Sequence, residues 1–311
     1  MERIRCILCG SNAAKSIMEL PDQRYGATGQ LFRVMQCVHC GLIYENPRPS
    51  KDEIAQFYPS EYYEPRKSSF GVNDGVLGNL RSFRRKIVLK EKARKVERVK
   101  LTGRILDVGC ASGDFLSFMK GRGWQTQGIE PSKSMCTYAS THYGLEVFHG
   151  VLEDAGLGDR VFDVITFWSV LEHLHDPLGT MREAARVLKP DGYVIVLVPN
   201  IESWEAKLLG KKWPHLDVPR HLVHFSPKTL TELIHKAQLQ VERISYSVDW
   251  IQTSHLDRFF YPRFAEHAQE NPRSLLYLLY KVLNLTLLPL SWLSSAAKHG
   301  QAVIVYASKQ Y

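Results

Sequence analysis

The sequence lacks the features that would mark a secreted protein. Its first thirty residues contain no continuous apolar stretch of the kind that forms the core of a secretory signal peptide. Cysteine is scarce, with six among 311 residues, and four of the six fall in two C-x-x-C pairs. Pairs at this short spacing in a protein without a signal peptide are more typical of metal sites than of disulfides. We therefore expect a protein of the reducing cytoplasm that carries a metal site.

An excess of acidic residues is also missing. The chain has 40 Lys and Arg residues against 32 Asp and Glu residues, which gives a net charge of +8. This balance permits nucleic acid or anionic lipid as a partner but selects neither. With 44% hydrophobic and 23% charged residues, the composition is that of an ordinary globular protein, and the length suffices for one full α/β domain with smaller additions.

Two matching cysteine turns lie near the start of the chain. Cys6 and Cys9 form the first pair, Cys37 and Cys40 form the second, and a glycine follows each pair. Each turn brings two thiolates together, and the glycine lets the backbone fold back, as a tetrahedral Zn²⁺ site requires. We predict a zinc ribbon over residues 1–60, although the spacing between the pairs is somewhat longer than usual. A closed four-thiolate site is usually structural, and contact with substrate is a second alternative.

Residues 61–100 are predicted to form a linker and a basic helix. Tyr58 at the end of the ribbon, together with Tyr62 and Tyr63 at the start of the linker, either packs the ribbon against its neighbour or lines a substrate site. The part from Leu80 to Lys100 carries ten Lys and Arg residues and only part of an apolar stripe. It is either a solvated helix or a surface for a phosphate-bearing substrate or anionic lipid.

The stretch RILDVGCASGDF, residues 104–115, is the most informative part of the chain. An apolar run interrupted by Asp107 leads into a glycine-rich turn and then into helix-forming residues, which predicts a buried parallel strand, a tight turn and a helix. A dinucleotide-binding turn offers its helix N-terminus to a pyrophosphate, which a neighbouring carboxylate would repel. Asp107, two residues before Gly109, therefore favours a cationic ligand with an amino group.

The segment D-V-G-C-A-S-G resembles the first motif of the class I S-adenosylmethionine-dependent methyltransferases, which usually reads D/E-x-G-x-G-x-G. Ala111 stands where a second glycine is commoner. The resemblance implies that residues of this turn hold S-adenosylmethionine, namely Asp107, Gly109, Cys110, Ala111 and Gly113.

Two further acids follow along the chain. Glu130 stands 23 residues beyond Asp107, at the tip of the next predicted strand, where a carboxylate accepts both ribose hydroxyls of an adenosine ligand; a helix-capping role is the alternative. A third strand is predicted between Gly144 and Gly150. Related methyltransferases often place an acid just after it to meet the adenine amino group. Because position 151 is Val, that contact falls to the backbone or to Glu153.

Two longer segments extend the resemblance. FDVITFWSVLEHLHDP, residues 162–177, and RVLKPDGYVIVLVPN, residues 186–200, resemble class I methyltransferases of the ubiquinone-biosynthesis O-methyltransferase type and their relatives among sugar and natural-product enzymes. This implies a Rossmann-like, seven-stranded α/β fold over residues 101–250 plus 300–311, in which the terminal strand is antiparallel. It also places Phe167 among the cofactor-binding residues.

Three histidines are candidates for a general base. A bacterial subgroup of these proteins has a segment that resembles D-x-P-R-H-L-x-H-F-S, which here contains His221 and His224. A neutral imidazole could take a proton from an acceptor hydroxyl, and His173 is the third candidate. Each has a structural alternative, as an anchor of the following helix or as a helix cap. Arg220 either holds a phosphate or carboxylate of the substrate or pairs with Asp217.

A hydrophobic helical insertion is predicted over residues 251–299, before the last strand. Its apolar core, residues 274–295, is nearly long enough to span a membrane, but Lys281, Asn284 and Pro289 interrupt it, and the strands on either side belong to one sheet. A helical hairpin or an interfacial segment dipping into the bilayer from the cytoplasm fits better. A cap on the domain or a dimer interface is the alternative.

Taken together, the sequence predicts a methyltransferase that uses S-adenosylmethionine and carries Zn²⁺. We expect a small-molecule or lipid-linked acceptor, such as a sugar, a glycan-lipid or a quinone-like compound, methylated on oxygen or carbon. An RNA methyltransferase is a second candidate, but the positive charge is gathered in one helix without a plausible base-stacking surface, which disfavours nucleic acid. The third is a catalytically silent cofactor-binding protein. We expect a cytoplasmic location, with contact to the inner face of the membrane through residues 274–295 as an option.

Overall fold

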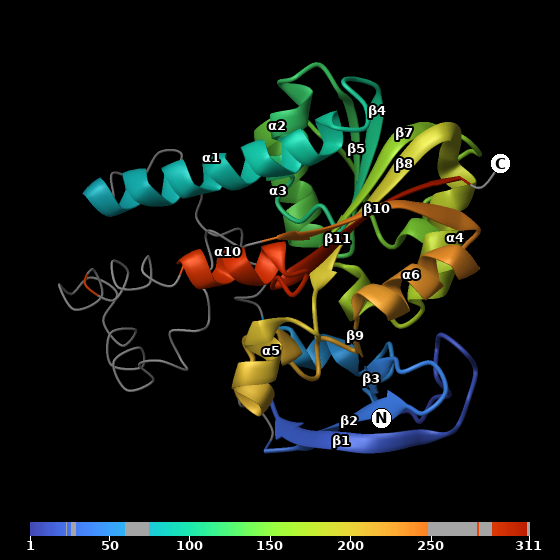
Figure 1. Ribbon diagram of the computed structural model, residues 1–311. Coiled ribbons are helices and arrows are strands. Elements are labelled where there is room, and N and C mark those ends of the chain that lie inside the picture. The colour runs from blue at the N-terminus through green and yellow to red at the C-terminus, as the bar shows by residue number, and fades with distance from the viewer. Residues whose placement is uncertain (23, 26–28, 60–74, 248–278, 280–287, 310–311) are drawn as a thin grey trace.

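The computed structural model describes residues 1–22, 24–25, 29–59, 75–247, 279 and 288–309 (Figure 1). These residues form a central seven-stranded sheet with helices on both faces, and a smaller four-stranded sheet beside it. Tyr62, Tyr63 and most of the predicted insertion, including residues 274–278 and 280–287 of its apolar core, lie outside the described residues.

The central sheet has the strand order β10-β11-β8-β7-β4-β5-β6. Its strands are β4 (Arg104–Val108), β5 (Gln125–Glu130), β6 (Glu146–His149), β7 (Phe162–Trp168), β8 (Leu188–Pro199), β10 (Leu239–Ser247) and β11 (Ala302–Lys309). Strands β4 to β8 run parallel, whereas β11 is antiparallel to both β8 and β10. The predicted seven-stranded α/β fold with an antiparallel last strand is confirmed.

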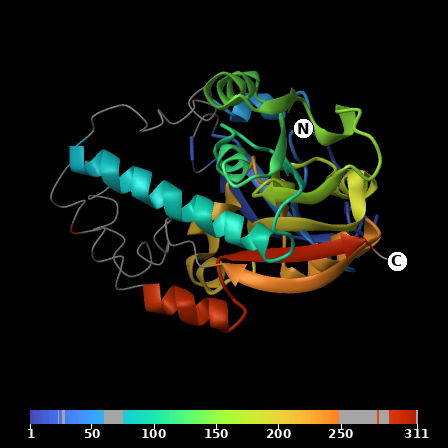
Figure 2. The same cartoon turned by 90° about the horizontal axis from the view of Figure 1, so that it is seen from above.

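Helices cover both faces of this sheet (Figures 1 and 2). On one face lie α1 (Gly75–Glu97), α2 (Asp114–Lys120) and α3 (Lys133–Tyr143), and on the other lie α4 (Pro177–Val187) and α6 (Pro227–Lys236). Each face has its own cluster of buried apolar side chains, because parallel strands covered on both sides bury both sets of alternating residues.

Local signals explain where these helices begin. At α4 the Asp176 side chain accepts a hydrogen bond from the Gly179 N–H at 2.8 Å, and at α6 Ser226 forms a reciprocal capping box with Thr229. The basic helix α1 begins five residues earlier than Leu80 and buries Ala93 and Val96 against the sheet. Leu89 packs partly against the same cluster, whereas Phe83 is 62% exposed, so the apolar residues do not form one continuous buried stripe.

The small sheet joins the cysteine-bearing region to the main domain. It contains β1 (Ala14–Pro21), β2 (Leu31–Cys37), β3 (Ile43–Glu45) and β9 (Val223–His224), in that order. Strand β9 comes from the D-x-P-R-H-L-x-H-F-S segment and pairs antiparallel with β3. The ribbon therefore shares a sheet with residues that follow β8, which the sequence did not predict.

The remaining described elements are short. They are the 3₁₀ turns η1 (Ile54–Phe57), η3 (Leu152–Asp154), η4 (Leu171–His173), η5 (Gly210–Lys212) and η6 (Pro214–Leu216), and the helices α5 (Trp204–Leu209) and α10 (Leu288–Ala296). In the part of the chain that the structure describes, no helix is both long enough and apolar enough to cross a membrane.

Candidate active site

The glycine-rich turn between β4 and α2 is shaped by close contacts. Gly109 has φ 71°, and a Cβ there would lie 2.7 Å from Val170 Cγ2. Gly113 has φ 76°, and a Cβ there would lie 2.6 Å from Leu145 Cδ1. Both positions therefore require glycine. Ala111 adopts φ 49° in the same turn, so the position where a second glycine is commoner keeps a left-handed backbone.

The turn is fastened to the neighbouring strand. The N–H groups of Gly109 and Cys110 both donate to the Ile129 carbonyl, at 2.8 and 3.0 Å. Glu130 follows directly, and its two carboxylate oxygens accept from the N–H groups of Ala111 (2.9 Å) and Ser132 (2.8 Å). The acid predicted to hold ribose thus lies against the glycine-rich turn, at the carboxyl end of β5.

Asp107 is buried at the carboxyl end of β4. It accepts a hydrogen bond from Thr166 Oγ1 at 2.6 Å, and burial raises its pKa to about 7, partly opposed by the charge of Lys92. Lys92 and Thr166 offset only part of the cost of burying this carboxylate, so a cationic ligand beside it would stabilise its charged form. The residues present therefore fit S-adenosylmethionine, whose amino group is cationic.

Lys92 is a residue of this site that sequence reasoning missed. Its Nζ lies 5.1 Å from the centre of the Trp168 ring and 5.7 Å from that of Phe115, and the two rings meet edge to face. In the sequence Lys92 is one of ten similar residues in the basic helix, and nothing local distinguishes it. Only the packing of α1 beside α2 brings its charge to the glycine-rich turn.

Two predicted cofactor residues are engaged elsewhere in the described structure. Phe167 has no exposed surface and belongs to the core cluster on the α4 and α6 face, whereas the next residue, Trp168, belongs to the cluster on the α1 face that contains Cys110. Alternation along the strand causes this difference, because successive side chains point to opposite faces. The Glu153 carboxylate accepts a hydrogen bond from Thr180 Oγ1 of α4.

The three candidate histidines lie where the small sheet meets the carboxyl end of β7. His173 Nδ1 lies 3.0 Å from the Arg220 carbonyl, and His221 Nδ1 lies 2.8 Å from the His215 carbonyl. Because a carbonyl only accepts, both Nδ1 atoms carry protons and both Nε2 atoms keep a lone pair. The two rings are 4.5 Å apart.

Burial keeps all three imidazoles neutral. It lowers the pKa of His173 and of His224 to about 4, and that of His221 well below its usual range. Among the described residues, His224 Nε2 has no hydrogen-bond partner, and neither carboxyl oxygen of Glu172 has one. Burial also raises the pKa of Glu172 to about 8. The structure thus brings together histidines that the sequence left as separate candidates.

The ribbon contributes directly to this cluster. Tyr58 lies with its hydroxyl 3.0 Å from His173 Nδ1, and the Glu45 N–H donates to the Leu222 carbonyl beside the histidines. Glu172, in the segment resembling the methyltransferases, was not singled out from the sequence. The sequence feature that could have identified it is the L-E-H-L run shortly after a buried strand, because this run places an acid at the carboxyl end of β7.

Arg220 has a structural role. Its side chain is fully buried and forms ion pairs with Asp22 (2.6 Å) and Asp217 (2.8 Å), and it also donates to the Phe57 carbonyl. The sequence left Arg220 either to bind the substrate or to pair with Asp217, and the structure shows the ion pair with Asp217. Asp22 of the ribbon pairs with the same guanidinium. The guanidinium has no exposed surface to offer a substrate phosphate.

Among the residues that the structure describes, two groups of side chains could hold a metal ion. In the first, Cys6, Cys9, Cys37 and Cys40 place their four Sγ atoms within 4.8 Å of one another, with Sγ to Sγ distances of 3.5 Å for Cys6 with Cys40 and for Cys9 with Cys37. Zinc bound to thiolates at about 2.3 Å spaces the sulfurs by about 3.8 Å, so the cluster fits tetrahedral Zn²⁺.

The second group is smaller. Glu172, His173 and His221 each offer one ligand atom within the same limit of 4.8 Å. Both imidazoles direct Nδ1–H at a backbone carbonyl, an arrangement that is common for metal ligands but equally suits a proton acceptor.

Comparisons with known proteins agree with this geometry. A profile of the methyltransferase domain family matches residues 80–244. The ubiquinone biosynthesis O-methyltransferase of Aliivibrio fischeri is 29% identical over 154 residues, which are 46% of this chain and 66% of the relative. That of Pseudomonas putida is 36% identical over 133 residues, which are 40% of this chain and 57% of the relative. The chain thus matches less than two thirds of the length of these curated relatives.

The fold agrees with that of solved methyltransferases. A structure of a SAM-dependent methyltransferase from Archaeoglobus fulgidus superposes with a TM-score of 0.50 and 19% identity, covering 72% of this chain and 94% of that one. Because the family profile spans more than half of the chain, and the sheet order and the glycine-rich turn agree with it, this protein belongs to the class I S-adenosylmethionine-dependent methyltransferases.

Proposed function

We propose that this protein methylates an oxygen or carbon atom of a small-molecule or lipid-linked acceptor, such as a sugar, a glycan-lipid or a quinone-like compound. The observation that carries the proposal is the group formed by buried Glu172 and His221 and partly buried His173 at the carboxyl end of β7, next to the strand that bears Asp107. Acceptors in open α/β sheets bind at this edge. Relatives named ubiquinone biosynthesis O-methyltransferase support the same acceptor class.

The histidine cluster supplies a proton acceptor. S-adenosylmethionine, when bound, supplies a methyl group activated by its sulfonium, so the protein must orient the acceptor and remove a proton. The Nδ1–H of His173 is held by the Arg220 carbonyl, which leaves the lone pair of Nε2 to take that proton. Tyr58 lies against the same ring and helps to fix it.

Glu172 has a complementary role in this proposal. Since burial raises its pKa to about 8, the carboxyl group is largely protonated at neutral pH and can donate a hydrogen bond. A neutral donor beside neutral imidazoles favours an uncharged polar acceptor, such as a hydroxyl or enol, over a phosphate. The acceptor would be ordered between the ribbon and the main domain.

A structural Zn²⁺ is part of the same proposal. The four cysteines of the ribbon would hold it, and their closed shell leaves no position for substrate. The ribbon's contribution to the reaction would then be indirect, through Tyr58 and through the strand pairing of β3 with β9.

The proposal is tested by following labelled methyl from S-adenosylmethionine into an extract of the host cell, which is then separated into lipid, water-soluble and RNA fractions. Label in the lipid or water-soluble fraction, absent with Asp107→Ala, is the expected result. Label in RNA would overturn the acceptor class. The absence of label above the Asp107→Ala background would instead favour a silent cofactor-binding protein.

The proposed base is tested with a matched pair of variants. His173→Asn keeps an N–H donor for the Arg220 carbonyl but has no proton acceptor, so kcat should fall by about 10²-fold to 10⁴-fold while binding of S-adenosylhomocysteine is unchanged. His235→Asn, at an exposed site on α6, is the control. A kcat for His173→Asn equal to that of the control would exclude His173 as the base.

A further inference from the structure

The ends of α1 and α10 project from the same side of the molecule (Figures 1 and 2). Residues of both helices line a basic groove. It is formed by α1, β10 and α10 and encloses a cavity of about 620 Å³. Four cationic side chains line it, and Glu91 is the one carboxylate among the lining residues in the described part of the chain. The cations are Arg94 and Lys95 from α1, Arg98 just after the end of α1, and Arg243 from β10.

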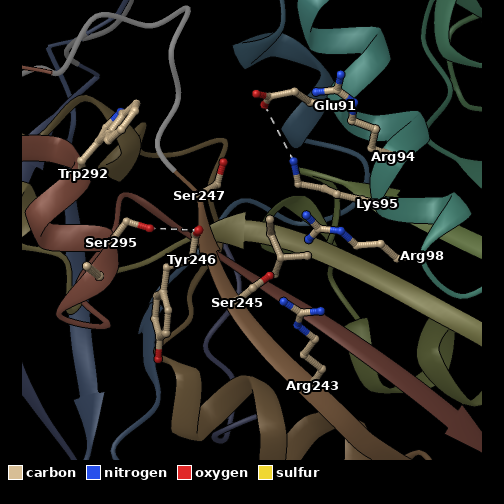
Figure 3. Close-up of a pocket in the computed structure, with 12 residues that line it drawn as sticks. Glu91, Arg94, Lys95, Arg98, Arg243, Ser245, Tyr246, Ser247, Trp292 and Ser295 are labelled. Atoms are coloured by element: carbon tan, nitrogen blue, oxygen red, sulfur yellow. Dashed lines mark hydrogen bonds and ion pairs between the residues drawn. The ribbon is translucent and has the colours of Figure 1, made fainter. Parts of the chain in front are cut away.

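The charges in this groove are poorly neutralised. Figure 3 shows Lys95 paired with Glu91, with Arg98 and Arg243 on either side of Ser245. Within the residues that the structure describes, neither of these arginines has a carboxylate partner. Both charges act on the buried side chain of Tyr306. Burial raises the pKa of Tyr306, and the two guanidinium groups partly offset this increase. Two like charges held around one buried hydroxyl would be stabilised by an anion that binds between them.

Helix α10 borders the groove and carries no charged residue. Three of its apolar side chains leave much of their surface exposed to solvent. The exposed fractions are 37% for Leu290, 51% for Trp292 and 59% for Leu293. Its other side is held to the protein, because Ser294 is buried and Ser295 donates a hydrogen bond to the Tyr246 carbonyl at 3.0 Å. An aromatic and aliphatic face beside a cationic groove is the arrangement of a membrane-interface helix.

We propose that this face docks on the anionic surface of a phospholipid bilayer. Lipid phosphates would occupy the groove at Arg98 and Arg243, and Trp292 and Leu293 would enter the headgroup layer. A soluble phosphate compound would satisfy the arginines but leave the apolar side chains of α10 in water. The bilayer satisfies both, which is why the structure favours it. The inference does not depend on which acceptor is methylated.

The first test measures binding of the full chain to vesicles by co-sedimentation. We expect binding to phosphatidylcholine vesicles that contain about a third phosphatidylglycerol, and much weaker binding to phosphatidylcholine alone or at high salt. Arg98→Gln with Arg243→Gln should weaken partitioning about 30-fold, because both exposed charges act at the lipid surface. Lys228→Gln with Lys236→Gln removes the same net charge from exposed sites on α6, away from the groove, and should retain binding.

The second test concerns the apolar face and the competing ligands. Trp292→Ser should weaken vesicle binding while thermal unfolding stays unchanged, since the residue is exposed. The proposal would be overturned if the double variant of the groove arginines and the double variant of the α6 lysines lost vesicle binding equally. Equal binding of the unaltered protein to charged and uncharged vesicles would also overturn it. Binding of inorganic phosphate or of an RNA oligonucleotide without vesicle binding would overturn it as well, in favour of a small-anion or nucleic-acid site.

Discussion

At the scale of single residues, the cofactor site depends on a few groups whose chemistry is altered by burial. Asp107 has its pKa raised to about 7 mainly because its carboxylate is removed from water, and Lys92 offsets this only in part. In the unliganded protein the folded state holds this proton more tightly than the unfolded chain does. The group therefore lowers the stability of the fold as pH rises from about 4 to about 7.

Binding of S-adenosylhomocysteine should be linked to this proton. Its amino cation favours the Asp107 carboxylate, so affinity should fall about 10-fold between pH 7.5 and pH 6 and level off above the pKa of about 7. Calorimetric titration in buffers with different ionisation enthalpies would detect the released proton. Asp107→Asn should bind weakly and show no such pH dependence. A wild-type affinity that does not change with pH would contradict this linkage.

At the scale of elements, the structure depends on how the ribbon is tied to the segment before β9. Arg220 connects Asp22, just after β1, to Asp217, and it also reaches the Phe57 carbonyl at the end of η1. Three stretches far apart in sequence are thus joined by one guanidinium. The Tyr25 ring lies 4.9 Å from the same group.

Replacing Arg220 should therefore cost more than replacing a surface arginine in the same network. Arg220→Met leaves two buried carboxylates without a buried partner, and we expect the free energy of unfolding to fall by about 3–5 kcal/mol. Arg24→Met removes a half-exposed partner of Asp217 and should cost less than about 1 kcal/mol. Urea titration would measure both. Similar losses for the two variants would contradict the structural role of Arg220.

At the scale of the whole molecule, the ribbon and the main domain form one continuous structure. Strand β9 completes the ribbon sheet, and the core clusters include side chains from both parts. Loss of order in the ribbon should therefore reach the histidine cluster, since Tyr58 and β3 both contact it.

Removal of zinc should show this coupling. Cys37→Ser is expected to lower bound zinc and, because a structural site contributes folding energy directly, to lower Tm and expose residues 1–59 to protease. Methyl transfer should fall with it, whereas binding of S-adenosylhomocysteine should persist. Cys136→Ala, a thiol on α3, should keep the full zinc content and serves as the control. Metal analysis that finds no zinc in the wild type would refute the ribbon site.

The sequence alone determined the order and type of the main elements. Strand β4 and helix α2 follow one another as predicted for residues 104–115, and β11 lies within the predicted residues 300–311, because continuous apolar runs bounded by turn residues have few alternatives. The glycine-rich turn was equally readable, since positive φ at Gly109 and Gly113 leaves glycine as the residue that fits without strain. The spacing of the two cysteine pairs likewise predicted that their four thiols lie together.

Only the tertiary structure decided which distant residues meet. The approach of Lys92 to Trp168 and the pairing of β3 with β9 both depend on how elements pack, and no local pattern encodes them. The same holds for Arg220, whose partner Asp22 lies 198 residues away. Local sequence specifies an element through its own backbone and periodicity, whereas a site between elements is specified by the sum of their contacts.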